Sequence, residues 1–354
     1  MVMEEMPKPR ETHILVRGAY DALGEKVTHN VPAVLTPLPA NAAPNRLSLA
    51  KWLLEPEHPL TARVTVNRLW QKFFGTGLVK TAEDFGVQGE PPSHPELLDW
   101  LAVEFRESWD VKRLERLLVT SGTYRQTSQA TPELLERDPE NRLLARAPRY
   151  RLNSHLLRDQ ALAAAGLLVE RIGGPPVKPY QPPGIWEDLS FDKIKYVQDS
   201  GQKLYRRSLY TFWRRSVGPT TMFDTATRQV CAVRTPRTNT PLQALTLLND
   251  PTFVEASRML GQRMLQEGGA STAERLTFAF RLLAARTPTP RELAILSRSY
   301  ERLLQQFQAD KAAAEQLISV GEHPRDTSLD PAEHAAYAGL ANLLLNLDEV
   351  LSKE

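Results

Sequence analysis

The sequence predicts a mainly α, multi-helical globular protein with an extended N-terminal arm and a small, irregular, partly β central insertion. Prolines stand just inside capping residues at Thr240, Thr289 and Ser93, each followed by a Glu or Gln at capping-box spacing. Aspartates precede Pro251 and Pro331 as helix caps. With the apolar periodicity, these signals predict helices at about 46–54, 60–74, 94–107, 110–121, 140–147, 153–169, 241–248, 251–267, 271–285, 290–309 and 331–350.

Two regions lack this helical pattern. In residues 1–45, "THILVRG" and "KVTHNVPAVL" are short β-branched runs, and "LTPLPANAAPN" is a proline-punctuated connector. Over residues 173–239, "KLYRRSLYTFWRR" alternates like a strand, and "RQVCAVRTPRTN" has no helical period. We therefore expect an extended arm over 1–45 and a single helical domain over 46–354, with the insertion at about 173–239.

Composition argues against several classes of protein. The chain has 354 residues and a formal charge of +2, which argues against nucleic acid as its partner. No apolar run is long enough to span a membrane. The start, "MVMEEMPKPRETH", has no apolar core and is not a secretory signal. Either the protein is cytoplasmic as written, or this chain is the downstream part of a longer one.

Metal and haem motifs are missing from the sequence. Cys231 is the only cysteine, which excludes an intrachain disulfide, a cysteine-based zinc site and a c-type haem attachment motif. The seven histidines show no metal-binding spacing. We expect no metal and no cofactor in this chain. Arginine is nevertheless abundant, at 32 residues against 12 lysines, and arginine suits the bidentate recognition of anions.

The stretch "RVTVNRLWQKFFGTGLVKTAEDFGVQGEPPSHPELLDWLA", residues 63–102, combines an apolar stripe with polar neighbours. Arg63 and Asn67 lie four residues apart beside the stripe, and His94 stands at the start of a helix. These three residues either form the rim of a site or tie one helix to the next. The stripe itself indicates a buried helical face, and its members are Val66, Leu69, Trp70, Phe73 and Phe74.

The segment "MFDTATRQVCAVRTPRTNTPLQAL", residues 222–245, gathers charged side chains without periodicity just before a helix start. Free N–H groups at a helix start attract anions, and arginines can hold a sulfate, phosphate or carboxylate by paired hydrogen bonds. In the alternative interpretation, the same arginines bind carbonyl groups and hold a buried loop in place. The candidate ligand-binding residues are Asp224, Arg228, Cys231, Arg234, Arg237 and Asn239.

Several segments together resemble the planctomycete-specific C-terminal domain family, domain of unknown function 1553. They include "NRLSLAKWLLEPEHPLTARVTVNRLWQKFFGTGL", "LLVTSGTYRQTS", "GGPPVKPYQPPGIWEDL", "VCAVRTPRTNTPLQALTLLNDPTFVEASRML" and "LLNLDEVLSKE". The resemblance implies a periplasmic or cell-envelope location, downstream of a second domain and often of a planctomycete-type cytochrome c domain. It assigns no catalytic residue here, and haem is implied only for the upstream domains.

Two functions follow as hypotheses. In the first, the chain is a substrate-binding or catalytic lobe for an anionic ligand, such as a sulfated or acidic glycan. In the second, it is a non-catalytic scaffold that docks onto upstream domains. The sequence leaves open the reaction, the substrate and the oligomeric state, and does not decide whether the protein is an enzyme.

Overall fold

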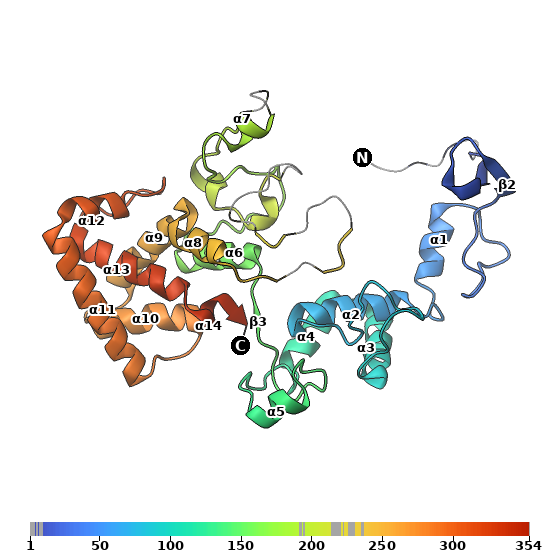
Figure 1. Ribbon diagram of the computed structural model, residues 1–354, viewed down its shortest axis with the longest axis horizontal. Coiled ribbons are helices and arrows are strands. Elements are labelled where there is room, and N and C mark those ends of the chain that lie inside the picture. The colour runs from blue at the N-terminus through green and yellow to red at the C-terminus, as the bar shows by residue number, and fades with distance from the viewer. Residues whose placement is uncertain are drawn as a thin grey trace. The chain divides into compact units, whose positions relative to one another are not determined.

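A computed structural model describes residues 4, 6, 10–190, 193, 195–213, 221, 223–225, 231–234 and 237–353. The chain divides into two compact units, Met1–Ala147 and Pro148–Glu354. The described residues form fourteen α-helices and two small two-stranded sheets. The predicted fold class, mainly α, is therefore confirmed, and Figure 1 shows helices along most of both units.

Unit 1 begins with the arm. Strands β1 (Thr12–Leu15) and β2 (Leu23–Val27) pair antiparallel, with an irregularity in their register between His13 and Leu15. A connector then leads to helix α1 (Arg46–Leu53), where Asn45 caps the first turn by accepting a hydrogen bond from the Ser48 N–H. We expected one or two short strands in the arm, and two form. The first lies within "THILVRG", whereas the second overlaps the run "KVTHNVPAVL" only at Lys26 and Val27.

The rest of unit 1 is a small helical cluster. Helix α2 (Thr61–Phe74) packs against α3 (Pro95–Ser108) and α4 (Val111–Thr120), and a short helix α5 (Pro132–Arg137) follows. Val66, Trp70 and Phe74 are buried in its core, as the apolar stripe predicts. Leu69 and Phe73 are partly buried against the same core.

Unit 2 is built around α9 (Pro251–Glu267) and α13 (Pro331–Leu345), which make its most extensive helix–helix contact. Helix α13 is buried on nearly every side, which explains its almost uniformly apolar sequence "HAAYAGLANLLL". The other elements are α6 (Ser154–Ala164), α7 (Ile185–Ser190), η2 (Gly201–Tyr205), η3 (Ser208–Tyr210), α8 (Pro241–Asn249), α10 (Thr272–Ala284), α11 (Pro290–Ala309), α12 (Lys311–Ile318) and α14 (Asp348–Leu351).

One glycine lets the two central helices approach closely. A Cβ atom at Gly261 of α9 would lie 2.7 Å from the backbone nitrogen of Ala338 on α13. Ala335 and Ala338 are also buried at this contact side of α13. Small residues on both helices therefore set the separation of α9 and α13, and a larger residue at position 261 would push them apart.

Most predicted helix caps are confirmed, but one is wrong. Thr240 and Thr289 form complete capping boxes, and Asp250 and Asp330 cap α9 and α13. Ser93 does not cap α3. His94 takes the N-cap position there without a side-chain hydrogen bond to the helix, and the Ser93 hydroxyl lies 3.0 Å from the His94 ring.

Three further predictions need correction. No helix forms over 140–147, because Asn141 and Leu144 adopt positive φ and the Asp138 carboxylate accepts bonds from the next backbone N–H groups. The helix expected at 153–169 ends at Ala164. A strand was expected over 203–215, of which the structure describes 203–213. That part instead contains the end of η2 and all of η3, with isolated β-bridges at Arg206 and Thr211.

Candidate functional site

The arginine-rich segment reaches the start of α8 through an anchored aspartate. Asp224, whose φ is +59°, accepts hydrogen bonds from the Thr238 N–H at 3.1 Å and the Thr238 hydroxyl at 2.5 Å. Its carboxylate also accepts from Gln243, at 3.2 Å, and Gln243 completes the capping box with Thr240. Asp224 thereby holds the segment onto the α8 cap, and its hydrogen-bonding capacity is largely used in that role.

Arg237 and Asn239 lie against a short strand that leads into α6. The guanidinium carbon of Arg237 stacks 3.9 Å from the ring centre of Tyr150, in cation–π geometry. The Asn239 side-chain oxygen accepts a hydrogen bond from Nη1 of Arg151 at 2.8 Å. Strand β3 (Tyr150–Arg151) carries both partners and pairs antiparallel with β4 (Ser352–Lys353).

Arg151 is the most unusual member of this group. Its Nε and Nη2 atoms are buried and have no hydrogen-bond partner in the described structure. These two nitrogens form the side-on edge of a guanidinium, which binds carboxylates and oxyanions through two parallel hydrogen bonds. Burial lowers the pKa of Arg151, while the negative charges of Asp224 and Asp348 oppose that shift.

Two neighbouring cations share this environment. Burial also lowers the pKa of Arg237 and of Lys353, which pairs with Tyr150 across the β3–β4 ladder. Arg149 forms an ion pair with Asp348. We call Arg149, Arg151, Arg237 and Lys353 the basic cluster, and Asp224 and Asp348 lie next to it. Four cations against two carboxylates leave an excess of positive charge.

The remaining candidates of the segment are placed differently. Cys231 and Arg234 are exposed, and Arg228 lies outside the described residues. The sequence did not indicate Arg151 as a candidate. It stands some 70 residues before the arginine-rich segment, and its sequence context is that of an ordinary charged residue beside α6. Only the pairing of β3 with β4 and the contact with Asn239 reveal its position.

The three rim candidates belong to unit 1, and each has a structural partner. Arg63 donates to Asp99 at 2.6 Å and to the Pro59 carbonyl at 2.7 Å. The hydrogen bond from Arg63 lowers the pKa of Asp99. The buried amide of Asn67 bonds both backbone groups of Val79, at 2.9 and 3.0 Å. This pairing fixes the turn after α2.

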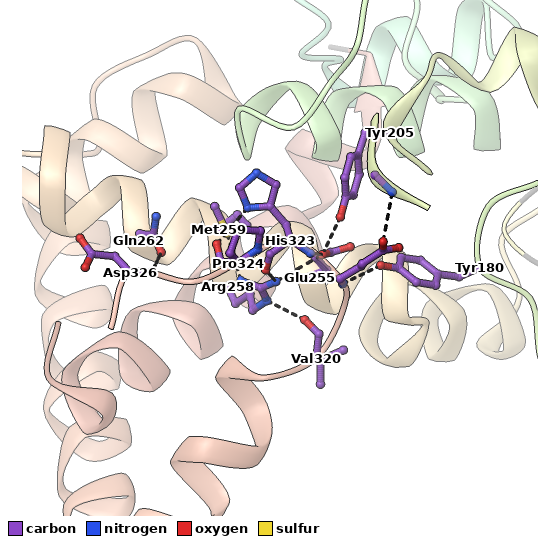
Figure 2. Close-up of polar contacts among 12 residues, drawn as sticks. Tyr180, Tyr205, Glu255, Arg258, Met259, Gln262, Val320, His323, Pro324 and Asp326 are labelled. Atoms are coloured by element: carbon purple, nitrogen blue, oxygen red, sulfur yellow. Dashed lines mark hydrogen bonds and ion pairs between the residues drawn. The ribbon is translucent and has the colours of Figure 1, made fainter. Parts of the chain in front are cut away.

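A second polar group, absent from our candidates, surrounds Glu255 in the interior of unit 2 (Figure 2). Its Oε1 atom accepts from the Tyr205 hydroxyl at 2.9 Å, from Arg258 at 3.2 Å and from the His323 N–H at 2.7 Å. Oε2 is buried and has no partner among the described atoms. We call Tyr180, Tyr205, Glu255, Arg258 and His323 the Glu255 cluster.

The Glu255 cluster joins four parts of unit 2. Glu255 and Arg258 belong to α9, Tyr205 ends η2, His323 lies between α12 and α13, and Tyr180 precedes α7. Burial raises the pKa of both tyrosines, that of Tyr180 to about 12, so both stay neutral near neutral pH. Tyr205 donates to Glu255, and the Tyr180 hydroxyl accepts from the Glu322 N–H at 2.8 Å. Because Glu255 and Arg258 are both 1% exposed, the cluster is suited to holding α9 against its neighbours rather than to meeting a solute.

Arginines that bind carbonyl oxygens recur throughout both units. Arg158 is fully buried and donates to the carbonyls of Leu204 and Arg206. In the same way, each of several other arginines binds backbone oxygens in an irregular segment or at a helix end. They are Arg142, Arg146, Arg206, Arg258 and Arg263. The carbonyl-binding role that we considered for residues 222–245 is thus the ordinary use of arginine in this protein.

Within the described part of the chain, no group of three or more His, Cys, Asp or Glu side chains is arranged to hold a metal ion. Among the same residues, no helix is long and apolar enough to cross a membrane.

The fold and site thus define a mainly α protein with a basic cluster beside a capped helix. The family described as "Protein of unknown function (DUF1553)" matches residues 45–300. The chain therefore belongs to this family, as its sequence resemblance indicated. Comparison with curated proteins and with solved structures gives no match.

Proposed function

We propose that unit 2 binds an anionic group, such as the sulfate or carboxylate of an acidic glycan, at the basic cluster. The observation that carries this proposal is the empty side-on edge of Arg151. A buried guanidinium edge without an acceptor is costly, because its donors have lost water and gained nothing in exchange. An oxyanion on that edge would satisfy both donors with charge-assisted hydrogen bonds.

The charges around Arg151 support the same proposal. Asp224 is held by Thr238 and Gln243, and Asp348 is paired with Arg149. Neither carboxylate hydrogen-bonds Nε or Nη2 of Arg151. A bound anion would supply the missing negative charge near three cations whose charged forms are disfavoured by burial. The envelope location and the upstream cytochrome-type domain implied by the resemblance belong to this proposal as well.

The test compares anions as stabilisers of the folded chain. Sodium sulfate and sodium glucuronate, each at matched ionic strength against sodium chloride, should raise the unfolding temperature through binding to the native state. Arg151→Met keeps an apolar stem but removes the fork, so the anion-specific rise should disappear. Arg302→Met, at an exposed position of α11, should keep it. An equal rise in unfolding temperature for the natural chain, Arg151→Met and Arg302→Met would contradict the proposal. It would show that the salts act by general exclusion from the protein surface.

A second candidate function, a scaffold that docks onto another domain, is favoured by the arm. All of residues 10–51 are described, and none of their side chains is buried. Such a segment gains little from its own packing to offset the entropy of ordering it. In the isolated chain, amides of β1 and β2 should therefore exchange with solvent far faster than those of α9. Comparable protection in the arm and in α9 would contradict the docking role.

A further inference from the structure

The arm exposes several large apolar side chains. Exposure reaches 54% for Ile14, 87% for Tyr20, 63% for Leu23 and 89% for Val34. A two-stranded hairpin is marginally stable on its own and needs a third strand or a packed face. Patches of this kind mark sites of interaction rather than ordinary surface.

A cavity of about 750 Å³ lies where the hairpin, the connector and α1 meet. Residues 10–12 and 26–31, at the open end of the hairpin, form one wall, and the start of α1 forms another. Its apolar lining is supplied by Val27, Val31, Leu38, Ala42 and Leu49. Its volume is in the range of ligand pockets, and the backbone that follows β2 runs along it.

The cavity is also positively charged. Arg10, Lys26 and Arg46 line it, and among the lining residues that the structure describes Glu11 is the one with an acidic side chain. Glu11 is already paired with Lys26, at 2.7 Å. The first turn of α1 adds the positive end of a helix dipole. An occupant with negative charge would therefore complement this lining.

Strand β2 offers a backbone edge to such an occupant. It pairs with β1 on one side, and the two strands form a complete sheet among the residues that the structure describes. An unpaired strand edge is a ready template for an added strand, and neighbouring pockets then select its side chains. Apolar lining, basic charge and a free edge together fit an extended peptide better than a compact solute.

We infer that the arm binds an extended acidic peptide segment of a partner protein, which adds as a strand beside β2 and places its apolar side chains in the cavity. This inference rests on the docking role proposed for the arm and adds the chemistry of the partner. The exchange measurement above tests docking without any peptide. If the peptides show no charge preference, the docking role itself is not contradicted. If the amides of the arm are protected from exchange, the docking role is contradicted whatever the peptides do.

The experiment uses the full chain and three fluorescein-labelled ten-residue peptides, in which valine alternates with glutamate, serine or lysine. Fluorescence anisotropy should show the glutamate peptide binding at least tenfold tighter than the lysine peptide, with affinity falling as salt rises. Arg46→Glu should weaken the glutamate peptide at least tenfold. Arg116→Glu, at an exposed position of α4, should leave it unchanged and is the matched control.

Three results would overturn the inference. One is equal binding of the three peptides, which would show that charge plays no part. Another is unchanged binding of the glutamate peptide to a chain that lacks residues 1–44, which would place the peptide elsewhere. Self-association of the chain that disappears with the same deletion would also count against it, because a second copy would then be the occupant.

Discussion

Arg258 and Glu255 form an ion pair one turn apart on α9, with Nη2 of the guanidinium 3.2 Å from Oε1 of the carboxylate and both side chains 1% exposed. Arg258 also donates through Nε to the Val320 carbonyl, at 2.6 Å, and through Nη2 to the His323 carbonyl. One arginine thus neutralises a buried carboxylate and fixes the segment between α12 and α13.

Removing the cation should be strongly destabilising. Arg258→Met leaves Glu255 buried without a counter-charge, and we expect the free energy of unfolding to fall by about 3–5 kcal/mol in urea titrations. Arg302→Met, at an exposed site, should change it by less than about 0.5 kcal/mol. The double variant Glu255→Leu and Arg258→Met should recover part of the loss. A double variant as unstable as the sum of both single ones would refute this account.

Gly321 is required because of its neighbour Glu255. Its φ is +90°, and a Cβ atom there would lie 2.2 Å from Cδ of Glu255. Gly321→Ala should therefore lower the free energy of unfolding by about 2–4 kcal/mol, through backbone strain and displacement of the buried carboxylate.

Gly173→Ala separates backbone strain from the collision with Glu255. Gly173 also has a positive φ, +77°, but a Cβ there would meet nothing within 4 Å. Its replacement should cost only the conformational strain, about 1 kcal/mol. If both variants lose the same amount of stability in the same titration, the collision with Glu255 contributes nothing.

Arg158 should not tolerate lysine. Its Nη1 donates to the Arg206 carbonyl at 2.9 Å and its Nη2 to the Leu204 carbonyl at 2.7 Å, within a fully buried site. A lysine keeps the charge but cannot reproduce the planar fork. Thermal unfolding of Arg158→Lys should show a loss of about 2–4 kcal/mol. Arg207→Lys, exposed in the same region, should be neutral, and a similar loss there would point to a general arginine effect.

The stability of unit 2 should depend on pH through Glu292. Hydrogen bonds from Arg286, at 2.6 and 3.0 Å, lower its pKa to about 2, against about 4.3 in the unfolded chain. The unfolded state thus takes up the proton first, so the contribution is complete above about pH 5 and is lost as the pH falls toward 2. The pair is about one-third exposed, so solvent screening limits it to about 0.5–1 kcal/mol.

Glu292→Gln tests this dependence without removing the helix cap, because glutamine also serves in a capping box. Unfolding titrations at pH 6 and pH 3 should differ less for this variant than for the natural chain. Glu301→Gln, exposed on the same helix, should keep the full difference. An unchanged pH difference in Glu292→Gln would rule out the pair as its source.

The sequence predicted helices well where the signals are local. Two helix starts are defined by capping boxes, whose hydrogen bonds join residues three apart: Thr240 with Gln243, and Thr289 with Glu292. Because these bonds are local, the sequence alone predicts them. Ser93 carries the same pattern but fails, because its hydroxyl is 3.0 Å from the His94 ring and its N–H bonds Leu78 across the turn. Non-local contacts decided that end of α3.

The candidate site was less predictable for the same reason. Arg237 and Asn239 were recognised from their position before a helix, but their partners Tyr150 and Arg151 are about 90 residues away in the chain. The Glu255 cluster was missed altogether, because Glu255 and Arg258 stand at ordinary helix-surface spacing. Only tertiary packing places them in the interior.

The β3–β4 pairing has a topological consequence. Tyr150 pairs with Lys353, so the first and last strands of unit 2 are neighbours, although some 200 residues separate them. Adjacent ends make a fold tolerant of circular permutation and of insertion into a host loop. A chain joining residue 353 to residue 148 through a short linker, and opened between the exposed residues Gly269 and Ala270 that follow α9, should keep the α9–α13 core. We therefore expect unit 2 to tolerate insertion into a loop of another protein, because its two ends already lie side by side.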